Sequence, residues 1–217
     1  MSAATPIKID FVSDVVCPWC AVGLASLQQA IDRLGDDVAV DLHFQPFELN
    51  PQMAAEGEDI DEHITRKYGS TPQQLAQNRE AIRARGAALG FTFGTRQRIY
   101  NTFDAHRLLH WAALESHEKE MALKQALLRA YFTDGEDVSS HATLTRIAAQ
   151  AGLDAGRAEQ ILASDEYADD VRAQERYYTE RGIRAVPSVI INDRHLISGG
   201  QPVEVFEQAL RQIAAKV

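Results

Sequence analysis

Two cysteines three positions apart are the residues of this 217-residue chain whose spacing most directly suggests chemistry. They are its only cysteines, and they enclose a proline and a tryptophan in the segment Cys17-Pro18-Trp19-Cys20. A CxxC pair can supply half of a zinc site, form a redox-active disulfide, or place two small side chains in a core. In an intracellular protein such a pair more often indicates metal binding or redox catalysis than a structural bridge.

Histidines at helical spacing are the candidates for completing a zinc site. His106 and His110 lie at i and i+4 of a predicted helix, a spacing that can chelate, and His117 lies on the same face. All three are far along the chain from Cys20, so no local loop would close around a metal. We therefore expect no metal site at the cysteines.

The position of the pair at a predicted helix start favours redox chemistry over simple burial. Cys17 falls at the N-cap, Pro18 at N1, where its missing N–H costs nothing, and Cys20 at N3. The free backbone N–H groups and the helix dipole favour the thiolate form of Cys17. We expect Cys17 to be an exposed nucleophile and Cys20 to be a more buried thiol that reacts second.

The elements around the pair form a strand–helix–strand unit. Residues 7–13 alternate apolar and polar positions as a strand does, and residues 38–47 predict a second strand. Between them, residues 21–35 carry apolar side chains at helical spacing and end at a glycine. The cysteines thus lie at the first strand-to-helix junction of a βαβ unit.

The middle of the chain predicts a series of amphipathic helices separated by turn signals. Apolar residues recur at helical spacing in residues 75–91, 101–115, 121–132 and 143–152. The strand pattern returns at residues 189–191, followed by a turn, a short strand through Leu196 and Ile197, and a closing helix.

This order predicts an α/β protein with a thioredoxin fold whose βαβ and ββα halves are separated by a large all-helical insertion. We assign residues 1–50 and 182–217 to the thioredoxin-like domain and residues 51–181 to the insertion. Pro187 directly precedes the third strand, where an X-Pro bond in a tight turn can be cis. In thioredoxin folds such a proline loop lies opposite the active disulfide.

Composition and charge exclude several classes of partner. The net charge is −9 with no basic cluster to offset it, so attraction to nucleic acid or anionic lipid is not expected. No apolar run is long enough to cross a membrane, and the first residues lack the pattern of a secretory signal. We expect a cytoplasmic protein, and the sequence leaves its oligomeric state open, a homodimer included.

Three segments, DVVCPWC at 14–20, YNTFDAHRLLHWA at 100–112 and GIRAVPSVIINDRHLISGGQP at 182–202, resemble the DsbA-like thioredoxin-fold oxidoreductases, specifically the FrnE-like branch. The resemblance covers nearly the whole chain. It implies a thiol–disulfide oxidoreductase with Cys17 as nucleophile and Cys20 as resolving thiol, acting on disulfide- or thiol-containing proteins or peptides. It implies no cofactor beyond this redox-active disulfide.

The same resemblance assigns roles to residues around the disulfide. Pro187 would be the cis-proline, and the backbone of Val186 would pair with the substrate, beside Pro18 and Trp19. Trp19 stands where periplasmic members carry a histidine, so their strongly oxidising character is not carried over. This chain also lacks the second cysteine pair of some FrnE-like proteins.

A neighbouring branch, comprising 2-hydroxychromene-2-carboxylate isomerase and kappa-class glutathione transferases, is the alternative enzyme. That branch has a serine in place of Cys17 and binds glutathione, which makes glutathione a candidate co-substrate here. A serine-type isomerase has no use for Cys20, which favours the oxidoreductase. A chaperone-like protein that binds unfolded chains through its helical insertion is the non-enzymatic alternative.

Several polar residues are candidates for tuning the thiols. We expect Asp14 to be an exposed loop carboxylate, and Glu48, after the second strand, to be a candidate proton acceptor for the buried thiol. By resemblance, Asn101, His106 and Arg107 face the active-site cleft and the first two contribute to substrate binding. Helix capping by the asparagine is the structural alternative.

Overall fold

The main sheet has four strands, and it pairs a strand from the beginning of the chain with one from its end. The computed structural model describes residues 6–35 and 38–216, so part of the sequence used for the leader and domain predictions lies outside it. The strand order is β2-β1-β5-β6, where β1 is Ile7–Ser13, β2 is Val40–Pro46, β5 is Ser188–Ile191 and β6 is His195–Ser198. β1 pairs parallel to β2 and antiparallel to β5, and β5 pairs antiparallel to β6. This is the predicted thioredoxin arrangement.

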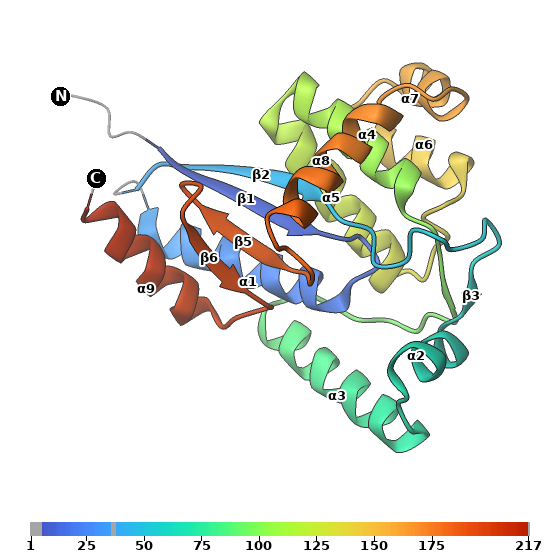
Figure 1. Ribbon diagram of the computed structural model, residues 1–217, viewed down its shortest axis with the longest axis horizontal. Helices are drawn as coiled ribbons and strands as arrows, with labels where there is room; N and C mark the ends of the chain where they lie inside the picture. The colour runs from blue at the N-terminus through green and yellow to red at the C-terminus, as the bar shows by residue number, and fades with distance from the viewer. Residues whose placement is uncertain (1–5, 36–37, 217) are drawn as a thin grey trace.

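Helices surround this sheet on both faces. The C-terminal helix α9 packs beside α1 on one face of the sheet (Figure 1). The remaining helices lie between β2 and β5 in the chain, and α4, α5 and α8 contact β2. The helix bounds are α1 Pro18–Leu34, α2 Ile60–Tyr68, α3 Pro72–Ala88, α4 Phe103–Glu115, α5 His117–Phe132, α6 His141–Gln150, α7 Ala155–Leu162, α8 Ala168–Glu180 and α9 Val203–Ala214.

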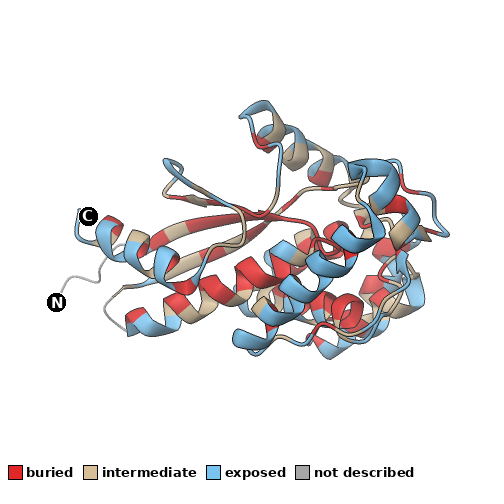
Figure 2. Ribbon diagram, turned by 90° about the horizontal axis from the view of Figure 1, so that it is seen from below, coloured by how far each residue is buried: buried red, intermediate tan, exposed pale blue. Residues whose placement is uncertain are grey.

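The side chains of β1 alternate between the two faces of the sheet, and each face packs against a different hydrophobic cluster. Ile9 and Phe11 belong to the main core cluster shared with α1 and α9, whereas Val12 packs with Tyr178 of α8 and Ile183. Figure 2 shows the central strands and the inner sides of the helices as buried. The main cluster also includes residues of α4, α5, α6 and α7, so the predicted insertion shares a core with the sheet.

The insertion differs from the prediction in not being wholly helical. Glu58–Asp59 (β3) and Arg98–Ile99 (β4) form a second, two-stranded antiparallel sheet at the ends of the α2–α3 segment. Gly57 makes this pairing sterically feasible, because its φ is +66° and an added Cβ would lie 2.3 Å from the Ile99 carbonyl oxygen. Strands of two residues carry no periodicity, which is why the sequence did not reveal them.

Two glycines allow the closing half of the fold to approach the start of α1. A Cβ on Gly23 would lie 3.0 Å from Pro187 Cγ, and one on Gly200 would lie 2.9 Å from the Trp19 carbonyl oxygen. Larger side chains at either position would push these segments apart. The close packing places the loop before β5 directly against the CxxC turn.

Candidate active site

The CxxC turn begins α1 as the sequence predicts. Cys17 is the N-cap residue, with extended backbone angles of φ −89° and ψ 113°, and Pro18 starts the helix. The Cys17 N–H donates to the Asp14 carbonyl at 3.3 Å, and the Cys17 carbonyl accepts from the Cys20 N–H at 3.0 Å. Both cysteines are free thiols. One helical turn therefore holds the two sulfurs on the same end of α1.

The expectation of an exposed Cys17 is wrong, because the Val186–Pro187 loop covers it. Cys17 is 4% exposed and Cys20 is fully buried. The peptide bond between Val186 and Pro187 is cis, and the Cys17 Sγ lies 3.7 Å from the Val186 carbonyl oxygen. Trp19, 38% exposed, is the surface residue of the motif.

The Cys20 thiol lies in surroundings that keep it protonated. Burial raises its pKa well above the ordinary value, and the neighbouring Cys17 sulfur raises it further. The backbone N–H of Asp14 and the Lys124 ammonium act in the opposite direction. Cys20 therefore needs a proton acceptor before it can react as a thiolate.

Lys124 of α5 is a functional candidate that the sequence analysis missed. Its side chain is 1% exposed, and its Nζ lies 5.5 Å from the centre of the Phe44 ring. Burial lowers the pKa of Lys124, against the smaller opposing effects of Cys20 and Asp14. A signal was present, because Lys124 falls one turn before Leu127 and Leu128 in the apolar stripe of its helix.

Asp14 is buried rather than exposed in a loop, contrary to the prediction. It accepts a hydrogen bond from the Leu49 N–H at 2.8 Å, and its other carboxylate oxygen lies 3.3 Å from His106 Nε2. Burial would raise the pKa of Asp14, but the bonds and charge of His106 and the Leu49 N–H outweigh it and lower the pKa. Asp14 is thus a buried acceptor directly before the CxxC turn.

His106 joins the insertion to the segment before the CxxC turn, and it is buried there rather than exposed in a cleft. Its side chain is buried, and Nε2 lies 3.2 Å from the Phe47 carbonyl oxygen as well as close to Asp14. Because a carbonyl can only accept, Nε2 must carry a proton in this arrangement. A role of His106 in substrate binding stays a prediction from the resemblance.

Glu48 is held by charged residues of α8 and not by the cysteines. It is 9% exposed, forms an ion pair with Arg172, and Arg172 also pairs with Glu175 at 2.7 Å. Burial and the Glu175 charge raise the pKa of Glu48 to about 7. Besides burial, the groups that shift the pKa of the Cys20 thiol are Cys17, Asp14 and Lys124, so Lys124 replaces Glu48 as the candidate proton acceptor.

The other two residues of the α4 start have structural contacts. The Asn101 side-chain oxygen accepts from the Phe103 N–H at 2.9 Å, and its amide donates to the Met53 carbonyl at 3.3 Å. Arg107 is buried and donates to the carbonyls of Ile161, Ser164 and Glu166. The Asn101 side chain thus accepts from the first residue of α4, whose N-cap is Thr102, and Arg107 anchors the α7–α8 connection.

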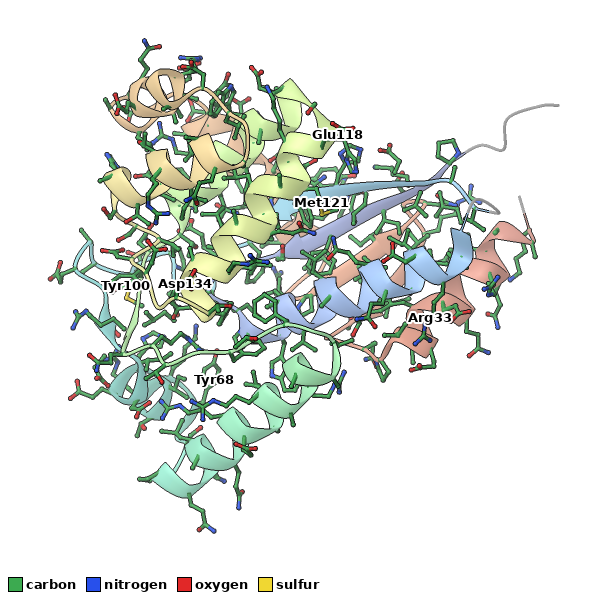
Figure 3. All side chains as sticks on the ribbon, turned by 180° about the vertical axis from the view of Figure 1, so that it is seen from behind. Arg33, Tyr68, Tyr100, Glu118, Met121 and Asp134 are labelled. Carbon is green, nitrogen blue, oxygen red and sulfur yellow. The ribbon has the colours of Figure 1, made fainter. Side chains whose placement is uncertain are left out.

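The end of α2 contributes two further residues that the sequence did not indicate. Burial raises the pKa of Tyr68, whose side chain is labelled in Figure 3, and the Cys17 charge raises it further. Its neighbour Lys67 donates to the Leu49 carbonyl at 2.7 Å. Lys67 therefore ties the end of α2 to the segment that follows β2.

The histidines expected to be alternatives for zinc do not gather at the cysteines. His110 packs against the ring of Tyr167 at 5.2 Å. Within residues 6–35 and 38–216, the one group of three His, Cys, Asp or Glu residues whose ligand atoms all lie within 4.8 Å of one another is Asp41, His43 and His117, without either cysteine. The absence of a metal from the CxxC pair stays a prediction from the sequence.

Comparison with known proteins identifies the family. A family model described as a DSBA-like thioredoxin domain matches residues 8–211. The chain belongs to this family. The crystal structure of a probable DsbA oxidoreductase from Streptomyces coelicolor is 35% identical, with a TM-score of 0.90 over 97% of this chain and 91% of its own. The uncharacterized protein YwbO of Bacillus subtilis is 28% identical over 94% of this chain and 96% of its own.

More distant DsbA-like structures share the fold but not a close sequence. The 2-hydroxychromene-2-carboxylate isomerase structure is 14% identical, with a TM-score of 0.72 over 96% of this chain and 97% of its own. The cytosolic disulfide reductase DsbM from Pseudomonas aeruginosa, solved with glutathione, is 15% identical, with a TM-score of 0.64 over 96% and 99%. Membership of the DsbA-like family supports a redox or isomerase enzyme. In the described part of the chain, none of the helices has the length and apolar character needed to span a membrane.

Replacing Glu48 by Gln should raise the stability of the protein relative to the parent protein more at pH 8 than at pH 5. The pKa of Glu48 is about 7 in the fold against an ordinary 4.5, so the folded state holds a proton that the unfolded chain releases first. The parent protein therefore loses free energy of unfolding, on the order of 2 kcal/mol, as the pH rises from below 4.5 through 7. The neutral amide of glutamine does not titrate, so the variant avoids this loss.

The measurement is the difference in Tm between Glu48→Gln and the parent protein at each pH, followed by circular dichroism. Glu180→Gln, an exposed change on α8, the helix that carries Arg172, serves as the control and should show a constant difference. A Tm difference for Glu48→Gln that stays constant or falls towards pH 8 would contradict this account of Glu48.

Proposed function

We propose that this protein is a thiol–disulfide oxidoreductase in which Cys17 is the nucleophile and Cys20 the resolving thiol. The observation that carries the proposal is the Cys17 sulfur at the start of α1, 3.7 Å from the Val186 carbonyl next to Pro187, with a fully buried Cys20 one turn away. A substrate chain that displaces the loop slightly would meet the sulfur and a backbone acceptor together. Trp19 would line the approach, with Pro18 fixing the helix start.

The reaction consists of two exchange steps. The Cys17 thiolate attacks one sulfur of a substrate disulfide, forming a mixed disulfide and releasing the other substrate sulfur as a thiolate. Cys20 then loses its proton and attacks the Cys17 sulfur, which forms the Cys17–Cys20 disulfide and releases the second substrate thiolate. Two electrons pass from the cysteine pair to the substrate, and the reverse sequence oxidises a dithiol.

Lys124 is the proposed proton acceptor in the second step. Its own pKa is lowered by burial while that of Cys20 is raised, so the two groups approach each other in proton affinity. Transfer of the proton from the Cys20 thiol to the neutral Lys124 amine would create a thiolate and an ammonium in a buried site, where their attraction is strong. Asp14 and His106 would position the β1–α1 turn during this step.

The proposed substrates are disulfide- or thiol-containing proteins or peptides, with glutathione as a candidate co-substrate. Glutathione is supported by the fold shared with DsbM, whose structure holds it. A cytoplasmic location remains a prediction from the sequence. Glutathione-dependent isomerisation is kept as the second candidate because 2-hydroxychromene-2-carboxylate isomerase shares the fold.

Replacing Cys17 by Ser should abolish thiol–disulfide exchange, because serine at neutral pH supplies no comparable nucleophile. Replacing Cys20 by Ser should preserve the first step and trap the mixed disulfide, because no resolving thiol follows. Insulin reduction and non-reducing electrophoresis against a thiol-containing peptide measure the two effects. Full exchange activity in Cys17→Ser would end the oxidoreductase proposal, and turnover of a chromene carboxylate by the same variant with glutathione would favour the isomerase.

Replacing Lys124 by Met should slow resolution of the mixed disulfide by roughly 10²-fold at neutral pH, the usual size of general-base effects. The rate should also reach half its maximum at a higher pH than in the parent protein, because the cation no longer lowers the pKa of Cys20. Methionine keeps the length and removes a buried charge, so folding is retained. A merely structural role for Lys124 would leave the pH profile unmoved.

The matched control is Lys119→Met, on the same helix but paired with Glu115 at its surface. Its resolution rate and pH profile should equal those of the parent protein. Equal profiles for both lysine variants would remove Lys124 from the mechanism.

A further inference from the structure

A cluster of metal-binding side-chain types lies where strand β2 meets the first turn of α5, outside the CxxC site. Asp41 and His43 project from the same face of β2, which is an edge strand, and His117 and Glu120 lie one turn apart on α5. One ligand atom from each of Asp41, His43 and His117 lies within 4.8 Å of the others. Figure 3 labels Glu118 and Met121, which flank the cluster on this helix turn beside β2.

Glu120 is the buried member of the cluster, and half of its carboxylate has no partner. Oε1 accepts a hydrogen bond from the Phe44 N–H at 2.8 Å, which holds the side chain against the free edge of β2. Oε2 is buried and has no hydrogen-bond partner among the described residues, although the Glu120 side chain is only 1% exposed. A buried carboxylate oxygen of this kind costs free energy unless a cation or donor faces it.

The groups that face this oxygen are two imidazole nitrogens. Oε2 lies 3.5 Å from His43 Nδ1 and 3.9 Å from His117 Nδ1, which is too long for hydrogen bonds. Ligand atoms around a tetrahedral zinc ion with bonds of about 2.0–2.1 Å are separated by about 3.3 Å, close to these spacings. Glu120 Oε2 therefore lies at a spacing from each of the two nitrogens that a bound ion could bridge.

Asp41 orients the His43 ring for such a role. Its Oδ1 lies 3.0 Å from His43 Nε2 and can accept the proton of that nitrogen. The proton on Nε2 leaves Nδ1 with a free lone pair directed towards Glu120. A carboxylate that fixes the tautomer of a histidine ligand in this way is the usual outer partner in metal sites.

We propose that His43, His117 and Glu120 bind one divalent transition-metal ion, with Asp41 as the hydrogen-bonded support of His43. Two imidazoles and a carboxylate form a ligand set suited to Zn²⁺ and to Cu²⁺ or Ni²⁺, and water would complete the coordination. Both histidine side chains are partly exposed, so an ion could enter from solvent. The site is independent of the proposed redox reaction.

Lys124 is the nearby charge that competes with a metal for Glu120. It lies one turn further along α5, and its ammonium and the Glu120 carboxylate influence each other electrostatically. No ion pair within 4.0 Å joins them among the residues that the structure describes, and Oε2 stays free. The lysine therefore reduces the affinity of the site for a cation without occupying its ligand.

The test is isothermal titration of Zn²⁺ into the full chain, prepared without a histidine tag and carrying Cys17→Ser and Cys20→Ser to remove thiolate ligands. One ion should bind per chain and raise Tm in proportion to its affinity. His117→Gln should weaken binding at least about tenfold, and Asp41→Asn about 10- to 100-fold as for other outer partners. Glu120→Gln keeps the acceptor for Phe44 but loses the charge, and it should also weaken binding.

The matched control is His195→Gln, on the exposed strand β6 outside the cluster, which should leave Zn²⁺ affinity unchanged. Each variant is first shown to be folded by its circular dichroism spectrum. Absence of Zn²⁺ binding in the cysteine-free protein would overturn the proposal, as would affinity that His117→Gln and Glu120→Gln leave unaltered.

Discussion

The hydrogen-bonding of one buried carboxylate, Asp14, is the constraint on which the rest of the site depends. It lies in the turn between β1 and α1 and is tied to the Leu49 N–H after β2 and to His106 of α4. A buried carboxylate must have such partners, because leaving it unpaired costs several kcal/mol. The three segments are therefore held at one point beneath Cys17, and α1 begins at a fixed position relative to the sheet.

The helical insertion packs over the CxxC region and also adds charged and polar side chains to it. A simple strand–helix unit would place the two sulfurs correctly but would leave Cys20 without a nearby base. The insertion supplies His106 from α4 and Lys124 from α5. The closing half of the chain adds the Val186 carbonyl, and glycines at 23 and 200 let it pack closely. Three regions distant in sequence thus complete the surroundings of one CxxC turn.

Much of the fold was predictable because its signals are local. The strand at residues 7–13, the cysteines at a helix start and the hairpin near the end follow from periodicity and turn residues, and the structure places them as expected. Helices α2, α7 and α8 were not singled out, because few apolar residues mark a face on any of them. The short β3–β4 pair depends on a long-range backbone contact that no local pattern encodes.

The charged part of the site was less predictable, because burial of a polar residue is decided by tertiary packing. Asp14 has the sequence of an exposed loop residue and Glu48 that of a free carboxylate near a strand end. Their partners, His106 and Arg172, come from helices far along the chain. Lys124 was the exception: its place in an apolar stripe was a readable sign that it is buried.

The equilibrium reduction potential of the Cys17–Cys20 pair tests the central claim most directly. It can be measured from the alkylation shift of the protein in glutathione buffers of graded ratio, with the Cys20→Ser variant as the reference for a single thiol. The account predicts a reversible two-electron couple between about −270 mV, as in thioredoxin-like reductants, and about −120 mV, as in strong oxidants. Two thiols that alkylate independently at every ratio, with no reversible disulfide, would contradict it.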